Sequence, residues 1–165
     1  MSVRNVVSWT AMIVGYVSMG DLVEAKRLFG EMPQRNIASW NTMITGYVRF
    51  GDLMAARRVF DEMPEKNVVS FTSTIDGYAK AGDMASARHL FEQSPDRDIV
   101  AWTALITGYV QNGQPREAVN IFEEMSARNV KPDEFIMVSL MSACSQLGNL
   151  DMAKFVDSYV SRSAH

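Results

Sequence analysis

Cysteine, histidine and long hydrophobic runs are scarce in this chain of 165 residues. Cys144 is the only cysteine, which excludes an internal disulfide and a cysteine-rich metal site. With His89 and His165 as the only histidines, we expect no metal and no cofactor. No stretch approaches the ~20 consecutive apolar residues of a membrane-spanning helix, so we expect no membrane partner.

Positive charge and targeting signals are lacking as well. The formal net charge of −3 gives no global attraction to nucleic acid, so any polyanion must be bound through local arrangement. The first residues, MSVRNVVSWT, resemble neither a secretory signal nor an organellar transit peptide, and we expect any targeting segment to lie outside this chain. No Gly-rich nucleotide loop, G-x-S-x-G elbow or zinc-deaminase signature occurs, which predicts that the chain is not an enzyme.

What the chain does contain is an internal repeat. The same pattern recurs five times, and its glycines are spaced 31, 31, 31 and 35 residues apart: Gly20, Gly51, Gly82, Gly113 and Gly148. Alanines recur at the same spacings, at Ala25, Ala56, Ala87, Ala118 and Ala153. The pattern predicts one array over residues 1–165, with repeats at about 6–36, 37–67, 68–98, 99–133 and an incomplete fifth at 134–165.

Each repeat is predicted to form two helices. In the first copy an apolar helical stripe is formed by Trp9, Ile13, Tyr16 and Val17, and it ends at Gly20. Asp21 is expected to cap the second helix, with Glu24 completing a capping box. The second stripe consists of Ala25, Leu28, Phe29 and Met32, and Pro33 ends that helix.

Such a helix pair cannot bury both stripes alone, which predicts an all-α fold, an α-solenoid of stacked helix-turn-helix repeats. We expect the recurring aromatic residues to fill the space between paired helices, which argues against base stacking: Trp9, Trp40, Phe71 and Trp102. The same structural role is expected for Met32, Met63 and Met125.

The pattern V-V-S-W-(T/N)-x-(M/L)-I-x-G-Y, followed by G-D and F-x-E-M-P, resembles the pentatricopeptide repeat proteins of plants. The three 31-residue copies are similar to their short-type repeat, the fourth to the standard 35-residue type and the fifth to the long type. The resemblance implies a right-handed superhelix that binds single-stranded RNA, one base per repeat, with the N-terminal repeat toward the RNA 5′ end. It also implies a role in RNA processing or editing-site recognition in the mitochondrion or chloroplast.

In that family the fifth residue of a repeat and its last residue read the base together. The resemblance therefore implies four reading pairs here: Thr10 with Asn36, Asn41 with Asn67, Thr72 with Asp98, and Thr103 with Asp133. In the fifth copy the first position is Val138, which has no hydrogen-bonding group, so that copy is expected to read nothing. Because Asn and Asp are also common N-caps, capping is the alternative role for each last residue, and the two roles can coexist.

Hydrogen-bonding chemistry indicates which bases these pairs select. Guanine and uracil present a ring N–H that an Asp carboxylate accepts, whereas adenine and cytosine present a bare ring nitrogen that needs the amide donor of Asn. The family pattern adds that Thr at the fifth position goes with purines and Asn with pyrimidines. The combined prediction is 5′-A-(C, less often U)-G-G-3′.

Two further sets of residues are implied to contact RNA. The second residue of each repeat should clamp the base, at Val7, Ala38, Val69, Val100 and Phe135, with Ala38 the weakest. Arg49 and Lys80 match the family's basic residue that contacts phosphate. Arg35, Lys66 and Arg97 could add to that positive charge, and the alternative for all five cations is a solvated surface.

Two other functions fit the same repeats. The negative net charge favours a protein–protein interaction scaffold, in which the groove binds a peptide instead of RNA. The chain starts at a repeat boundary and stops within the fifth copy without polar capping helices, so uncapped repeat ends are expected to allow a homodimer.

Overall fold

The described part of the chain is entirely helical. The computed structural model describes residues 5–148 and 150–163, which contain α-helices, turns and irregular segments and no strand. The helices are α1 (Val6–Ser18), α2 (Leu22–Glu31), α3 (Ile37–Arg49), α4 (Leu53–Glu62), α5 (Val68–Ala81), α6 (Met84–Gln93), α7 (Ile99–Gln111), α8 (Pro115–Ala127), α9 (Glu134–Leu147) and α10 (Leu150–Ser163). The alternation of first and second helices confirms the predicted all-α repeat fold.

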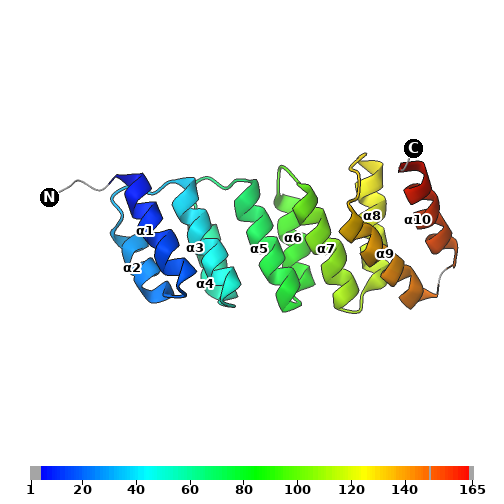
Figure 1. Cartoon of the computed structure of the whole chain (residues 1–165), viewed down its shortest axis with the longest axis horizontal. Helices are drawn as coiled ribbons and strands as arrows, with labels where there is room; N and C mark the ends of the chain where they lie inside the picture. The colour runs from blue at the N-terminus through cyan, green and yellow to red at the C-terminus, as the bar shows by residue number, and fades with distance from the viewer. Residues whose placement is uncertain (1–4, 149, 164–165) are drawn as a thin grey trace. The chain divides into compact units, whose positions relative to one another are not determined.

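The helices belong to two compact units, Met1–Gly77 and Tyr78–His165, with the boundary inside α5. In the first unit α1 packs on α2 and on α3, and α3 packs on α4 (Figure 1). In the second unit α7 packs on α6, α8 and α9, and α9 packs on α8 and α10 (Figure 1). Within each unit, therefore, a first helix contacts both its own second helix and the next first helix.

A left-handed glycine ends the first helix of each repeat. Gly20 has φ of +80°, and the N–H of Asp21 donates to the carbonyl of Tyr16 at 2.9 Å, which closes the turn. Asp21 then accepts the backbone N–H of Glu24 at 3.0 Å and so caps α2. The predicted capping box is only half formed, because the Glu24 carboxylate accepts from Arg27 Nε at 3.0 Å.

Stacking of repeats brings first helices very close together. A Cβ added at Gly46 in α3 would lie 2.9 Å from Cγ1 of Val17 in α1, so glycine allows this approach without displacement of Val17. Gly108 in α7 is crowded by the second helix of the preceding repeat, because a Cβ there would lie 2.9 Å from Cε of Met84 in α6. Substitution at either glycine would force neighbouring side chains to move.

Aromatic pairs join the second helix of one repeat to the first helix of the next. Edge-to-face pairs, with ring centroids 4.9, 5.0 and 4.7 Å apart, are formed by Phe29 with Trp40, Phe60 with Phe71, and Phe91 with Trp102. The sequence had indicated packing within a repeat, but these rings pack between repeats. They are buried, as are Met32, Met63 and Met125, in agreement with the predicted structural role. Trp9 of α1, for which the same role was predicted, is only half-buried. None of the described helices is long and apolar enough to cross a bilayer.

The burial of these rings leads to a stability prediction. Phe91 is fully buried, whereas Phe135 in the same unit is 75% exposed. Phe91→Ala should lower the free energy of unfolding by about 3–5 kcal/mol, because it removes the ring and leaves a cavity against Trp102.

Phe135→Ala is the matched control and should change the free energy of unfolding by only about 0.5 kcal/mol. Urea denaturation followed by circular dichroism measures both variants. Equal losses for the two would contradict this account of the core.

Candidate nucleic-acid interface

Each first helix begins with the same side-chain cap. The last residue of the preceding repeat accepts, on its Oδ1, the backbone N–H three residues later, at 2.8 Å for Asn36, 3.0 Å for Asn67, 2.9 Å for Asp98 and 2.9 Å for Asp133. These four predicted reading residues are therefore N-caps, which was the alternative role. A backbone N–H can only donate, so the atom that faces it must be the oxygen.

The cap decides which atom of each side chain faces the helix and which atom faces away from it. Once Oδ1 of Asn36 or Asn67 points at the helix N-terminus, the amide Nδ2 points away from it and offers donors. When the cap is Asp98 or Asp133, the second carboxylate oxygen replaces that nitrogen and can only accept. Capping and base reading are thus compatible, because they use different atoms.

The predicted fifth-position residues occupy equivalent places in the first helices. Thr10, Asn41, Thr72 and Thr103 all lie in the second turn of α1, α3, α5 and α7, and all are half-buried. The hydroxyl of Thr10 donates to the Val6 carbonyl at 2.7 Å, and that of Thr103 to the Ile99 carbonyl at 2.8 Å. With its proton engaged, such a hydroxyl offers oxygen lone pairs as acceptors.

Two of the four pairs are in direct contact. Asn41 Nδ2 donates to Asn67 Oδ1 at 3.1 Å, and Thr103 Oγ1 lies 3.5 Å from Asp133 Oδ2. Thr10 and Asn36 make no hydrogen bond to each other within the described residues. Thr72 and Asp98 belong to different units and are described separately.

The asparagine pair includes a residue that the sequence reasoning missed. The hydroxyl of Ser70, the third residue of α5, lies 2.7 Å from Oδ1 of Asn41 and 3.0 Å from Oδ1 of Asn67. A serine recurs at the third position of the first three repeats, as Ser8, Ser39 and Ser70, and this recurrence was the available signal.

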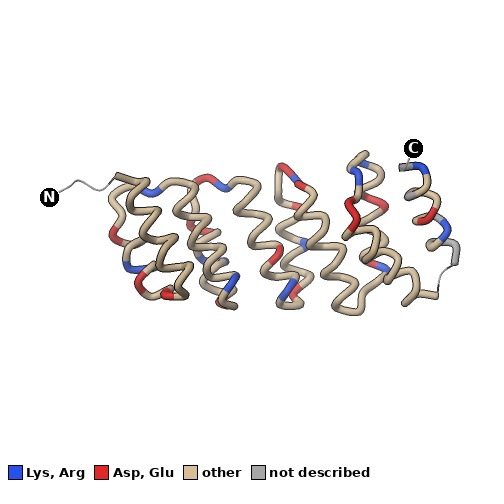
Figure 2. Tube along the Cα trace, in the orientation of Figure 1, with Lys and Arg blue, Asp and Glu red and all other residues tan. Residues whose placement is uncertain are grey.

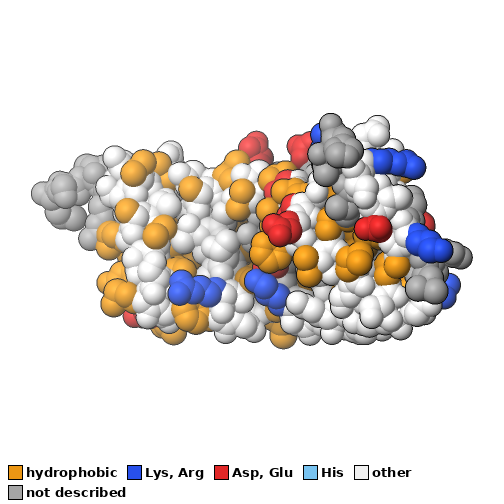
Figure 3. Space-filling model, turned by 45° about the vertical axis from the view of Figure 1, so that its right-hand side comes forward, with side chains coloured by type: hydrophobic (Ala, Val, Ile, Leu, Met, Phe, Trp, Pro, Cys, Tyr) orange, Lys and Arg blue, Asp and Glu red, His pale blue; other side chains and the backbone are white. Residues whose placement is uncertain are grey.

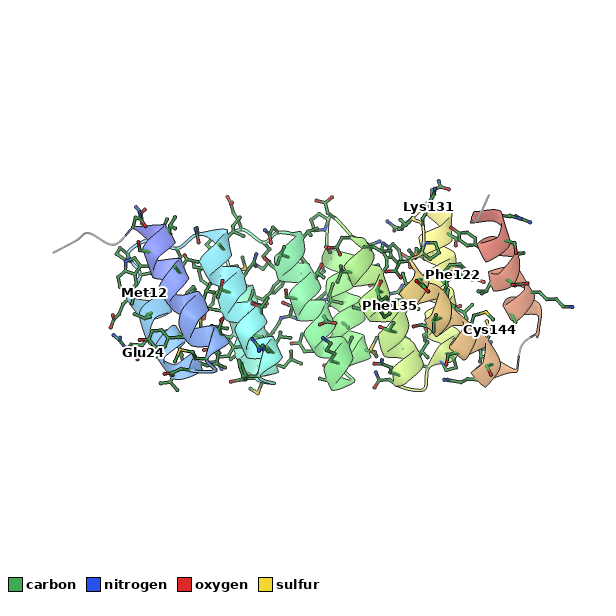
Figure 4. All side chains as sticks on the ribbon, in the orientation of Figure 1. Met12, Glu24, Phe122, Lys131, Phe135 and Cys144 are labelled. Carbon is green, nitrogen blue, oxygen red and sulfur yellow. The ribbon has the colours of Figure 1, made fainter. Side chains whose placement is uncertain are left out.

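The predicted clamp residues are apolar side chains at the surface. Val7, Val69, Val100 and Phe135 are 69%, 47%, 52% and 75% exposed, and the smaller Ala38 is exposed too. Figure 4 labels Phe135 near the start of α9, whereas the buried Cys144 lies farther along the same helix. Hydrophobic side chains also reach the molecular surface in Figure 3. An exposed apolar residue three positions before each reading residue lies on the same helical face.

The predicted phosphate contacts lie at the other end of the first helices. Arg49 ends α3 and Lys80 lies in the last turn of α5, and both are exposed. The Arg49 guanidinium carbon lies 5.4 Å from the Phe50 ring centroid. Figure 2 marks the Lys and Arg positions along the trace.

Arg35, Lys66 and Arg97 have a structural role that the sequence interpretation did not include. Arg35 Nε and Arg97 Nε donate to the carbonyls of Phe29 and Phe91 at 2.9 and 3.0 Å, and Lys66 Nζ donates to Met63 at 3.0 Å. Each cation also lies over the Phe ring of the preceding helix. Burial, followed by the nearby Arg128, lowers the pKa of Arg97. These cations complete the helix C-termini and stabilise the linkers.

A metal site and a reactive cysteine have little support in the described part of the chain. No group of three His, Cys, Asp or Glu residues in the described part of the chain is placed to hold a metal ion, and His165 lies outside that part. Burial raises the pKa of the Cys144 thiol, which disfavours the reactive thiolate.

Val138 in α9 is 64% exposed and apolar, at the place where the other copies carry Thr or Asn.

Models of known protein families match most of this chain. The family model described as PPR repeat matches residues 7–37, 38–68 and 69–99, and the model described as PPR repeat family matches residues 97–146. The chain belongs to the pentatricopeptide repeat family. The matched ranges begin one residue later than the first three periods taken from the sequence.

Relatives of this pentatricopeptide repeat chain occur in Arabidopsis thaliana. A putative pentatricopeptide repeat-containing protein is 67% identical over 36 residues, which are 22% of this chain and 6% of that protein. A mitochondrial pentatricopeptide repeat-containing protein is 66% identical over 32 residues, which are 19% of this chain and 5% of that protein. The matches therefore span a small part of the length of these relatives.

Solved structures share the α-solenoid fold of this pentatricopeptide repeat chain. Maize PPR10 superposes with a TM-score of 0.81 at 17% identity over 98% of this chain and 26% of that protein. PPR10 in complex with an 18-nt psaJ RNA element gives a TM-score of 0.75 at 17% identity, over 97% of this chain and 26% of that protein. The PPR domain of Arabidopsis thaliana protein-only RNase P 1, in complex with tRNA, gives 0.79 at 17% identity, over 94% and 88% of the two chains.

The cap geometry can be tested without any ligand. Asn36→Ala should lower the free energy of unfolding by about 1 kcal/mol, because the Ser39 N–H loses its acceptor. Asn36→Asp keeps an oxygen facing that N–H and should leave stability close to that of the parent chain. Thermal and urea unfolding of the three proteins measure this difference. If Asn36→Asp destabilised as much as Asn36→Ala, the assignment of Oδ1 to the cap would be wrong.

Proposed function

We propose that this chain binds single-stranded RNA in a sequence-specific way, with one base per repeat and the preference 5′-A-(C, less often U)-G-G-3′. The solved relatives in complex with an RNA element and with tRNA support RNA as the ligand, since their fold is the fold of this chain. Four readable bases make a short site, so we expect modest affinity.

The observation that carries the proposal is the orientation imposed by the N-caps. Because Oδ1 is used by the helix, Asn36 and Asn67 offer amide donors, which match the bare ring nitrogens of adenine and cytosine. Asp98 and Asp133 offer only acceptors, which match the ring N–H of guanine and uracil. Thr or Asn at the fifth position, by the family pattern, then separates purine from pyrimidine.

The surrounding side chains fit the same ligand. The exposed apolar residue that precedes each reader can cover a base face and lose its contact with water, which is favourable. Ala38 offers less surface than valine, so the first two bases should be held less firmly. Arg49 and Lys80 supply positive charge for the phosphates, and the fifth copy, with Val138, reads no base.

The proposed role is that of a binding module and not of a catalyst. RNA binding of this kind serves RNA processing or editing-site recognition, with a catalytic function supplied by another domain or protein. The relative named as mitochondrial supports an organellar location, in the mitochondrion or chloroplast.

The central test is a switch of base preference. Asn36→Asp replaces the displayed amide donor with an acceptor, so the preferred first base should change from A to G. Fluorescence anisotropy with four RNAs that differ only at that base measures the change, and we expect the A-to-G ratio of affinities to invert, with about tenfold change.

The other three positions of the RNA should keep their preferences in the Asn36→Asp variant and serve as the internal control. An unchanged preference for A at the first base, in a protein that is folded, would refute the reading assignment.

A protein–protein interaction scaffold is the second candidate, and one surface feature favours it. Val23 in α2 and Met54 in α4 are 82% and 78% exposed, beside a hollow of about 410 Å³ that Tyr47 also lines. Exposed apolar side chains beside a hollow are typical of protein contacts. A homodimer through the repeat ends, which is also a protein–protein interaction, stays a prediction.

Salt dependence separates the two candidates. RNA binding should weaken by about three- to sevenfold between 50 and 200 mM salt, because one or two neutralised phosphates release their counterions. A peptide bound through apolar contacts would respond far less. A plot of log Kd against log salt concentration for the preferred RNA measures the slope, and a flat plot would favour the scaffold.

A further inference from the structure

The Ser70 hydroxyl links the two reading residues of the second repeat. Ser70 is fully buried at the third position of α5, so its contacts are shielded from water. Its Oγ lies 2.7 Å from Oδ1 of Asn41, accepts the backbone N–H of Asn67 at 3.2 Å, and lies 3.0 Å from Oδ1 of Asn67. All three residues belong to the first unit.

The direction of every hydrogen bond in this group follows from one backbone N–H. The N–H of Ser70 donates to Asn67 at 3.0 Å, so the facing atom of Asn67 is Oδ1. Asn41 lies 3.1 Å from that same oxygen and must present Nδ2 to it. Asn41 Oδ1 therefore faces Ser70 Oγ, whose single proton is donated along the shorter, 2.7 Å contact.

This arrangement leaves donors on both reading residues. Asn67 retains the two N–H groups of its amide, and Asn41 retains the second N–H of Nδ2. Cytosine presents two adjacent acceptors on its Watson–Crick edge, the ring nitrogen and O2. Uracil has a ring N–H at the first of these places, which would face a donor. A pair of fixed donors therefore favours cytosine.

We infer that Ser70 is a positioning residue that sets the preference for cytosine over uracil in the second repeat. The inference rests on the proposed RNA-binding function and adds a residue outside the predicted pairs. The Ser70 hydroxyl adds a second hydrogen bond, to Asn41 Oδ1, beside the contact of Asn41 Nδ2 with Asn67, and so further disfavours a rotated amide that offers Oδ1 to the base.

The other repeats contain no equivalent link within the described residues. Ser39 has the same position, the same full burial and the same capping contact, but its hydroxyl donates to the backbone carbonyl of Asn36 at 2.8 Å. After the two aspartates the third position holds Ala101 and Ile136, which have no hydroxyl. Ser39 is therefore a matched control, which differs from Ser70 in lacking a contact with the preceding repeat.

The experiment compares Ser70→Ala and Ser39→Ala with the parent chain. Fluorescence anisotropy measures the affinity for four RNAs of sequence A-N-G-G within a fixed flank, with each base in turn at the second position. In Ser70→Ala the cytosine-to-uracil ratio of affinities should fall by about fivefold, the value of one hydrogen bond. Ser39→Ala should leave that ratio unchanged.

The outcomes distinguish this inference from the proposed function. A parent chain that prefers C over U, together with a Ser70→Ala variant that keeps the same ratio, overturns the inference and leaves RNA reading intact. Equal weakening for all four RNAs would assign Ser70 a merely structural role and also overturn it. A parent chain without preference at the second base would refute both. Ser70→Cys fills a similar volume with a weak donor, and it gives the same readout if the alanine variant does not fold.

Discussion

The hydrogen bond between a first-turn backbone N–H and the preceding Asn or Asp oxygen is the interaction on which this surface depends. It starts the first helix of each repeat and at the same time fixes the orientation of a polar side chain. An isolated amide can rotate and offer either its donors or its acceptor. The cap removes that freedom, so that a single choice between Asn and Asp determines the hydrogen-bonding character at one point of the array.

To discriminate between bases, such a surface must hold its hydrogen-bonding side chains in fixed positions. The linkers that carry the capping residues are held by Arg35, Lys66 and Arg97, which donate to the ends of the preceding helices and cover their phenylalanine rings. These three cations therefore stabilise the linkers that carry the capping residues. Under the proposed function, Arg49 and Lys80, both exposed near the ends of first helices, supply the phosphate contacts.

Much of the fold could be predicted from the sequence, because a periodic pattern repeats the same local information several times. The left-handed Gly20, the Asp21 cap and the buried methionines follow from local rules, and the structure agrees with them. Relations between repeats were harder to predict. The pairing of Phe29 with Trp40 and the link from Ser70 to Asn41 join residues from neighbouring repeats, and their geometry depends on how the repeats stack. Local rules also failed once. The capping box predicted at Glu24 does not form, because the Glu24 carboxylate accepts from Arg27 instead.

The contacts that cross repeat boundaries bear on how such an array can be re-engineered. A graft cut between Asn36 and Ile37 would separate Phe29 from Trp40, and one cut between Asn67 and Val68 would separate Asn41 and Asn67 from Ser70. A better cassette begins at the fifth residue of one repeat and ends at the fourth residue of the next. Modules exchanged in that frame would carry the fifth-position residue, the aromatic pair, the cap and its serine together. Under the proposed function, the residues that set base preference lie where two modules meet, so an exchange of modules would keep that junction intact.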